Sequence, residues 1–419
     1  MIKFGVLALL IALASGHKEN YRNYKVFRIS PTTFEQNALL HKLSELSDGY
    51  SFWNGPTIVN TTSDLMVSPE KINEFENLMK ISQTNYSVHI DDVEELIENE
   101  NPSVKSKSKL TSDGFDWKSY HTLEEIYAWL YLLADKYPNN VQVIVAGKTY
   151  EGRNITGIKI SFKNGNPGIF IESNIHAREW ITSATSTYLI NELLTSQNSD
   201  IRELAEKNDW YIFPVFNPDG FVYTHTKQRL WRKTRKPYGL FCRGSDPNRN
   251  WGYKWMEGGA SSMPCSETYA GTGPFSDIET LSMSKYIKSI SDKFYAYVSF
   301  HSYSQLLLFP YGHTEDHLDN YDQLLAIGKK TISALSTRYG TSYVTGNIAE
   351  TIYVASGGSM DWVKAEFKTP ITYTYELRDK GRYGFILPAN QIIPTGEETV
   401  DSLVAMFKEA KAYGIPERQ

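Results

Sequence analysis

Two histidines and one glutamate have the residue types and positions that a hydrolytic metal site requires. His176 and Glu179 form a His-x-x-Glu pair just after the apolar stretch 168–173, and His301 follows the apolar stretch 294–300. Two imidazoles and one carboxylate form the protein ligand set of hydrolytic zinc sites, which leave one position for water. Calcium or magnesium would require more oxygen ligands. The set predicts a zinc site; two hydrogen-bonded core histidines are the structural alternative.

A second glutamate stands at the end of a third apolar stretch. Glu376 follows residues 371–375, and Leu377-Arg378-Asp379 comes next. Short apolar stretches rich in β-branched and aromatic residues are typical of strands covered on both faces. Active sites of α/β sheets gather at the carboxyl ends of such strands. One His-x-x-Glu pair is weak evidence by itself, but three strand ends that carry reactive side chains predict one common site.

The segments that must position these residues alternate between strand and helix patterns. This alternation predicts an α/β domain with a mixed central sheet and helices on both faces, spanning residues 111–419. The expected strands are 168–173, 210–216, 294–300, 371–375 and a hairpin within 141–161. The expected helices are 121–137, 181–194, 277–290, 321–339 and 397–412.

Residues 17–100 predict a second, smaller α/β unit of ferredoxin-like type. Its expected strands are 24–29 and 85–90, and its expected helices are 32–46, 69–80 and 91–100. Residues 101–110 are polar, contain Pro102 and lack periodicity, which is typical of an exposed linker where proteolysis concentrates. Lys105, Lys107 and Lys109 would offer a trypsin-like protease several cleavage points, although a plain solvated linker explains the same residues.

The first 16 residues have the pattern of an export signal. Lys3 precedes an apolar run, and small residues at 14–16 offer a cleavage site. A buried N-terminal helix is the alternative. The formal net charge of -5 gives no electrostatic reason to expect nucleic acid or an anionic membrane as a partner. We therefore expect a secreted protein, and the acceptor triplets at Asn60, Asn85 and Asn154 are compatible with export.

The chain has two cysteines, Cys242 and Cys265. In an oxidising compartment, two thiols that close a loop of roughly 20 residues favour a disulfide, which would contribute about 3 kcal/mol. Two unpaired buried thiols are the other possibility.

Six ordered motifs closely resemble those of the A/B-type metallocarboxypeptidases of the digestive kind. They are NIHAREW, RLWRKTR, DPNRNW, SFHSYSQ, ASGGSMDW and ELRDKGRYGF. The resemblance covers about residues 115–415, and the upstream unit resembles the folded pro-segment of that family. It implies a monomeric zymogen that a trypsin-like protease activates and that acts on peptides with a free C-terminus.

Carried over by position, the resemblance makes His176, Glu179 and His301 the zinc ligands and Glu376 the general base and acid. Arg232 would face the developing oxyanion. Asp246 would orient His176. A clamp for the terminal carboxylate and further subsites are also implied: Asn248, Arg249 and Tyr353 for the clamp, and Arg178, Ser302, Tyr303 and Phe385 for the subsites. The family disulfide falls on Cys242 and Cys265.

The resemblance also implies where substrate specificity lies. Met360 matches the base of the pocket for the terminal side chain, where relatives that prefer basic residues carry an acid. The other matched wall positions are small or apolar: Leu308, Gly312, Ile348, Ile352, Ala355 and Thr374. An unpaired charged head would be costly to bury there, so we expect a preference for aromatic or aliphatic C-terminal residues.

Two other functional classes fit parts of the pattern. A binding protein with an inactive site would have lost ligands or the base, whereas this sequence retains all of them. A zinc deacylase of small amino-acid conjugates would lack a pro-segment. His313 and His317 lie four residues apart, but they follow Pro310-Tyr311-Gly312 without helical context, so we expect a solvated loop and no metal there. Cis peptides are implied at Ser302-Tyr303, Pro310-Tyr311 and Arg378-Asp379.

Overall fold

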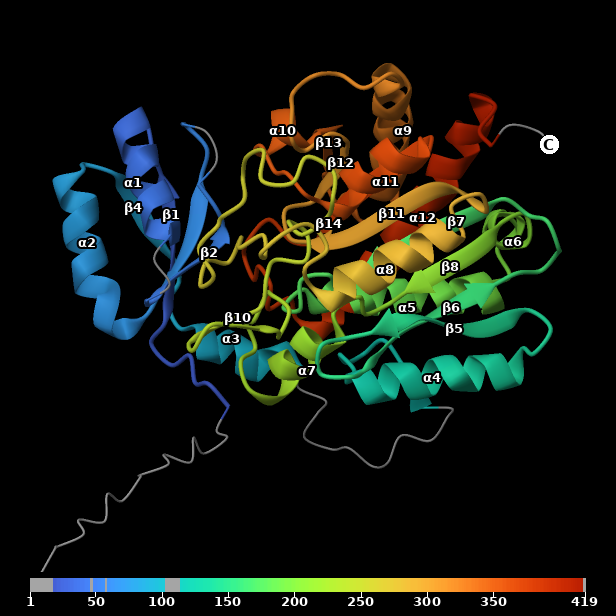
Figure 1. Ribbon diagram of the computed structural model, residues 1–419, viewed down its shortest axis with the longest axis horizontal. Coiled ribbons are helices and arrows are strands. Elements are labelled where there is room, and N and C mark those ends of the chain that lie inside the picture. Colours follow the sequence, from blue (N-terminus) through green and yellow to red (C-terminus); the bar gives the residue numbers. More distant parts are fainter. Residues whose placement is uncertain (1–17, 46–47, 57–58, 102–113, 417–419) are drawn as a thin grey trace, which may run out of the picture.

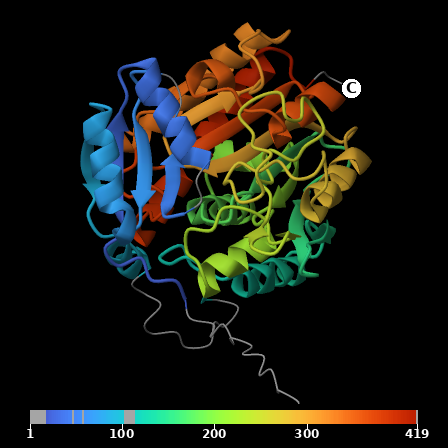
Figure 2. The same cartoon turned by 60° about the vertical axis from the view of Figure 1, so that its left-hand side comes forward.

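The computed structural model describes residues 18–45, 48–56, 59–101 and 114–416. The expected export signal and the linker lysines Lys105, Lys107 and Lys109 lie outside the described residues. Figures 1 and 2 both show a small N-terminal unit, drawn in blue, against one side of a larger α/β unit. None of the helices in the described ranges has both the length and the apolar composition needed to cross a membrane.

The N-terminal unit has a four-stranded antiparallel sheet in the order β2-β3-β1-β4, as a ferredoxin-like topology requires. The strands are β1 (Lys25–Ser30), β2 (Tyr50–Asn54), β3 (Ser63–Val67) and β4 (Asn85–Ile90). The helices are α1 (Phe34–Glu45), α2 (Ile72–Ile81) and α3 (Val93–Glu100), and a 3-10 turn at Pro69–Lys71 precedes α2.

Both faces of this small sheet carry buried side chains. On β1, Phe27 packs with residues of α1 and α2, while the neighbouring Val26 packs with Tyr303 and Phe385 of the larger unit. Alternate side chains of a strand point to opposite faces, so β1 joins two separate apolar cores. The second core fixes the N-terminal unit onto the larger one.

The larger unit is built on an eight-stranded mixed sheet in the order β13-β12-β14-β11-β7-β8-β6-β5. The central strands β14, β11, β7 and β8 are parallel, whereas β12 with β14, β8 with β6 and β6 with β5 are antiparallel pairs. The strands are β5 (Val141–Lys148), β6 (Asn154–Ile160), β7 (Gly168–Ser173), β8 (Asp209–Phe213), β11 (Phe294–Ser302), β12 (Leu306–Phe309), β13 (Val344–Asn347) and β14 (Ile371–Leu377).

Helices cover both faces of this sheet (Figure 1). On β7, Ile169 and Ile171 pack against the layer that contains α4, α5, α9 and α12, and Phe170 packs against α8 and α11. The helices are α4 (Leu123–Lys136), α5 (Trp180–Thr195), α6 (Ser199–Glu206), α7 (Pro218–Thr226), α8 (Ile278–Ser289), α9 (Tyr321–Tyr339), α10 (Ile348–Thr351), α11 (Ser359–Phe367) and α12 (Ile392–Ala412). The expected mixed α/β architecture is thus confirmed.

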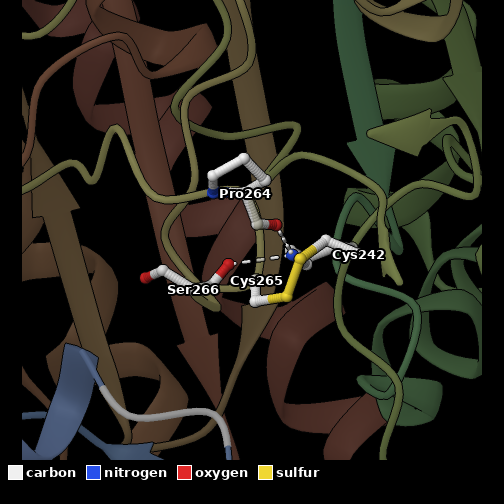
Figure 3. Close-up of a disulfide and its surroundings, with 5 residues drawn as sticks. Cys242, Pro264, Cys265 and Ser266 are labelled. Atoms are coloured by element: carbon white, nitrogen blue, oxygen red, sulfur yellow. Dashed lines mark hydrogen bonds between the residues drawn. A yellow bond between two sulfur atoms is a disulfide. The ribbon is translucent and has the colours of Figure 1, made fainter. Parts of the chain in front are cut away.

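A long loop between α7 and α8 contains only the short hairpin β9 (Pro237–Tyr238) and β10 (Cys242–Arg243). Cys242 and Cys265 are joined by a disulfide (Figure 3). Beside it, the Lys233 ammonium donates hydrogen bonds to the carbonyl oxygens of Pro264 and Ser266, both at 2.9 Å. The disulfide closes the loop 242–265, and Asp246, Asn248 and Arg249 all lie within that loop.

Candidate metal centre and catalytic cleft

Parallel strands bring the three expected metal ligands to the same edge of the sheet. His176 and Glu179 lie in the loop between β7 and α5, and His301 lies near the end of β11, which pairs with β7. The three residues are only 2–3% exposed. Their nearest ligand atoms all lie within 4.8 Å of one another, and His176 Nδ1 lies 2.8 Å from Glu179 Oε1 and 3.2 Å from His301 Nδ1.

The chemistry of these donors fits a zinc ion. Burial works against the charge of Glu179 and of His301, but the imidazoles lower the pKa of Glu179, and Glu179 raises the pKa of His301 to about 9. Two imidazole nitrogens that face each other beside a buried carboxylate favour a positive charge between them. Zinc supplies that charge and binds neutral imidazole and carboxylate. Within the described residues, no other His, Cys, Asp and Glu set of this kind occurs.

Asp246 lies behind His176. Its Oδ1 is 3.1 Å from His176 Nε2, and its Oδ2 accepts a hydrogen bond of 2.8 Å from Arg232. Burial raises the pKa of Asp246, but Arg232 and His176 outweigh burial and hold it well below the usual range. A carboxylate in this position fixes the ring so that Nδ1 faces the metal.

Glu376 lies beside the metal ligands without being one of them. It is on β14, where it is directly paired with His301 of β11. Glu376 also lines the cleft. Burial and the negative charge of Glu179 raise the pKa of Glu376 to about 8. The positive charges of His301, Arg232 and Arg249 lower this pKa but do not outweigh burial. A carboxylate with an elevated pKa at this place can both accept and release a proton.

One cleft connects the metal ligands with most of the other expected site residues. Besides the metal ligands and Glu376, the expected site residues that line it are Arg232, Asn248, Arg249, Ser302, Tyr303, Tyr353, Met360 and Phe385. The expected wall residues Leu308, Gly312, Ile348, Ile352, Ala355 and Thr374 line it as well.

Arg178 is the expected subsite residue that does not line the cleft. Its guanidinium lies 4.0 Å from the centre of the Phe385 ring and is 3.4 Å from both the Phe52 carbonyl oxygen and a Glu267 carboxylate oxygen. It is 2% exposed, and burial lowers its pKa to about 10. Phe52 belongs to β2, so the N-terminal unit contributes to covering Arg178.

Arg249 and Asn248 are held by the loops around them. Arg249 donates from Nε to the Gly259 carbonyl and from Nη1 to the Asn248 carbonyl, at 2.8 and 2.9 Å. No residue in the described part of the chain accepts a hydrogen bond from its Nη2. Asn248 Oδ1 accepts from the backbone N–H of Ser359, which orients the amide and keeps its Nδ2 as the remaining donor. Two donors therefore stay available at this point of the cleft.

The N-terminal unit supplies residues to the cleft that sequence patterns did not single out. Trp53, at the end of β2, lines it, and its ring lies 5.5 Å from that of Phe385. Asp64 of β3 accepts a hydrogen bond of 3.0 Å from the Tyr303 hydroxyl and forms a bidentate ion pair with Arg28. These contacts place one edge of the small sheet over the cleft.

Two further expectations concern the loop geometry. The peptide bonds Ser302-Tyr303, Pro310-Tyr311 and Arg378-Asp379 are all cis, as expected. The segment between His313 and His317 is an irregular loop, as expected, and His313 is partly exposed. Its ring lies 3.3 Å from an oxygen of the buried Asp361, so this side chain is partly covered within an otherwise exposed loop.

Family models place the chain unambiguously. Residues 126–402 match the model described as zinc carboxypeptidase, and residues 27–100 match the carboxypeptidase activation peptide. The chain is 43% identical to zinc carboxypeptidase A 1 of Anopheles gambiae, an alignment that covers 98% of this chain and 94% of the relative. It is 60% identical to a zinc carboxypeptidase of Simulium vittatum over 70% of this chain and 98% of the relative.

Solved structures agree with this assignment. The crystal structure of carboxypeptidase A from Helicoverpa armigera superposes with a TM-score of 0.85 at 30% identity, covering 94% of this chain and 99% of that one. The alignment therefore includes both the N-terminal unit and the larger unit. The chain belongs to the zinc carboxypeptidase family and is a zinc-dependent carboxypeptidase made with an activation peptide.

Proposed function

We propose that this protein is a secreted, monomeric zymogen that, once activated, hydrolyses the last peptide bond of peptides ending in apolar or aromatic residues. One observation supports this function above all others. Glu376, Arg232 and the pair Asn248–Arg249 line a single cleft together with the metal ligands. A base, an anion-stabilising cation and a carboxylate clamp are thereby within reach of one peptide terminus.

Glu376 is the proposed proton carrier. When zinc is bound, it lowers the pKa of its water to roughly 7. Glu376 takes a proton from the attacking water and gives a proton to the leaving amine. It can do both because its carboxylate lies on β14 beside His301 and is not a member of the ligand set. A ligand such as Glu179 could not release its lone pairs for this purpose.

Arg232 is the proposed stabiliser of the oxyanion that forms when water attacks the peptide carbonyl. Asp246 holds its guanidinium through Nε at 3.2 Å and Nη2 at 2.8 Å, while Nη1 lies 4.0 Å from Glu179. Burial disfavours its charge, but Asp246 and Glu179 raise its pKa further above the ordinary value. A fixed cation that needs no reorganisation during the reaction is effective at stabilising such an anion.

Asn248 and Arg249 are the proposed clamp for the terminal carboxylate, and Tyr353 would close over it. A planar guanidinium recognises a carboxylate well through paired hydrogen bonds. Arg249 is nearly buried and still has Nη2 available at the cleft. An endopeptidase would have no use for a cation at this place, so the clamp favours release of single C-terminal residues.

Met360 is the proposed floor of the pocket for the terminal side chain, because it lines the cleft within an otherwise small and apolar wall. Asp361, the residue after Met360, also lines this cleft and is an acid that could attract a basic residue. Its two oxygens, however, accept the backbone N–H groups of Gly312 and His313 at 2.9–3.3 Å. An Arg or Lys head would therefore be buried without a partner.

We expect the trypsin-treated protein to hydrolyse a blocked dipeptide ending in Phe at least about tenfold faster than one ending in Arg, because burying the unpaired guanidinium is costly. Steady-state kcat/KM values for the two substrates test this prediction. Met360→Asp is the matched variant and should raise the value for the Arg substrate. A chelator should stop both reactions. Equal or faster turnover of the Arg substrate by the unaltered enzyme would contradict the proposed specificity.

The proposed zymogen mechanism depends on how the N-terminal unit is attached. Trp53, Asn54 and Gly55 line the cleft, where they would exclude the chain of a peptide substrate. At the end of α3, Glu100 forms a buried ion pair of 2.8 Å with Arg229, three residues before Arg232. The proposed linker 101–110 follows Glu100 directly. Cleavage there would leave the N-terminal unit held only by noncovalent contacts.

We expect trypsin treatment to raise peptidase activity at least about tenfold, because a noncovalently held inhibitory unit can dissociate and a tethered one rebinds at high effective concentration. Activity measured before and after limited proteolysis, with N-terminal sequencing of the products, checks this. A triple variant with Lys105, Lys107 and Lys109 changed to Ala should stay at the lower activity. Full activity of the uncut chain would refute the zymogen proposal.

A further inference from the structure

The two histidines of the metal site differ in what their outer nitrogens contact. His176 Nε2 lies 3.1 Å from Asp246, which fixes that ring. His301 also turns Nδ1 toward the other ligands, with Glu179 Oε2 at 3.4 Å, so its Nε2 points away from them. This Nε2 is buried, and in the described part of the chain no atom forms a hydrogen bond with it. A metal-binding imidazole nearly always donates its second N–H to a partner.

Glu172 is a fully buried carboxylate on the same face of the sheet. It lies on β7, directly opposite Ser299 of β11, and His301 follows two residues later on the same face of β11. Its Oε1 accepts hydrogen bonds from the hydroxyls of Tyr297, Ser299 and Ser359, at 3.3, 2.6 and 3.1 Å. Its Oε2 is buried and has no partner among the described residues.

We propose that Glu172 Oε2 and His301 Nε2 are bridged by one buried water molecule, which makes Glu172 the residue that positions the third zinc ligand. The water would accept a hydrogen bond from the Nε2–H of His301 and donate one to Oε2 of Glu172. Each zinc-binding histidine would then have a carboxylate that orients its ring: Asp246 orients His176 directly, and Glu172 orients His301 through water.

Two observations support this assignment. The two unpaired atoms are buried at neighbouring positions of adjacent strands, and buried polar groups are almost always satisfied by protein or by ordered water. The two atoms form no direct hydrogen bond, which leaves a bridged contact as the way to satisfy both.

The three hydroxyls explain why Glu172 could serve this purpose rigidly. They occupy Oε1 from β11 and from the first residue of α11, so the carboxylate cannot rotate without losing all three bonds. Ser359 also donates its backbone N–H to Asn248. Glu172 therefore links the strand that carries His301 to the proposed carboxylate clamp.

The test is the zinc affinity of the full-length chain, measured by competition with a chromogenic chelator. Glu172→Gln retains an oxygen for the three hydroxyls but replaces the acceptor that faces His301 with an N–H₂ donor. Loss of such an outer-shell partner typically weakens metal affinity 10–100-fold, so we expect a change of about that size. Ser359→Ala is the matched control: it removes one hydroxyl from Oε1, leaves the proposed bridge intact and should keep the affinity within about twofold.

A second measurement reports on the ligand field rather than on affinity. In the Co²⁺-substituted chain, the visible absorption bands should shift for Glu172→Gln and should stay unchanged for Ser359→Ala. Unaltered affinity and bands in Glu172→Gln would overturn the proposal, as would equal losses in both variants, which would indicate a purely structural role.

If Glu172→Gln fails to fold, the crystal structure of the zinc-loaded chain decides. Density for a water within hydrogen-bond distance of both atoms supports the bridge, and its absence refutes it. These measurements require zinc binding but no peptide hydrolysis. Failure of the proposed function would therefore leave them interpretable.

Discussion

The variant Glu376→Gln should lose about 10³-fold in kcat while it retains its zinc. Proton transfer by a positioned side chain typically contributes 10²–10⁴-fold to a rate, and an amide can neither take a proton from water nor deliver one to the leaving amine. The ligand set His176, Glu179 and His301 does not include Glu376, so metal content should stay at the level of the unaltered enzyme. Single-turnover kinetics and metal analysis of the trypsin-treated protein measure the two quantities.

Glu279 offers a matched control for this variant. It is also a buried glutamate whose pKa burial raises to about 8, but it lies on α8 and accepts a hydrogen bond from the backbone N–H of Tyr150, away from the cleft. Glu279→Gln should leave kcat within about twofold, because its carboxyl touches no reacting group. If Glu376→Gln kept more than about a tenth of the activity, another group would have to carry the proton.

Much of the fold follows from strands whose two faces are both covered. The segment 168–173 is apolar up to Ile171 because Ile169 and Phe170 face different helix layers, and its bounds are those of β7. The strand limits at the site were less accurate. The ladder between β11 and β14 continues through Ser302 and Leu377, so His301 and Glu376 lie within paired strands rather than after them.

The parts that the patterns missed are stabilised by contacts between distant segments. Strands β2 and β3 were not expected because they are short and carry polar residues such as Ser63 and Asp64. Asp64 is acceptable in a buried strand only because Arg28 and the Tyr303 hydroxyl satisfy it. Tyr303 is 239 residues away along the chain, so the local sequence around Asp64 could not predict this partner.

The same distinction between local patterns and distant contacts holds for the residues of the candidate site. The metal ligands and Glu376 stand next to recognisable strands, so patterns could assemble them. Arg232 and Asp246 lie in a long loop with almost no regular structure, and only the family resemblance indicated their roles. Glu172 was overlooked although it left a signal in the sequence: an acidic residue inside an otherwise apolar strand needs a partner or a function.

Arg249→Met should reduce kcat/KM for peptides with a free C-terminus by about 10²–10³-fold. Truncating one partner of a buried charge pair typically costs 2–5 kcal/mol, and the substrate carboxylate would lose its buried partner. Met fills much of the same volume, which limits the cavity that the change leaves. Arg338→Met is the matched control, since Arg338 is a surface arginine that is paired with Asp401 and does not line the cleft, and its loss should alter kcat/KM less than about twofold.

The same variant separates a carboxylate clamp from a general structural effect. A peptide whose C-terminus is an amide offers Arg249 no charge to pair with, so it should be a poor substrate for the unaltered enzyme. Arg249→Met should therefore lower the rate for the acid far more than the rate for the amide, and the preference for the acid should shrink by most of the 10²–10³-fold loss. An equal loss for both substrates would mean that Arg249 supports the loop that Gly259 and Asn248 anchor rather than the substrate terminus. The ratio of acid to amide turnover thus decides whether this cleft is built for exopeptidase action.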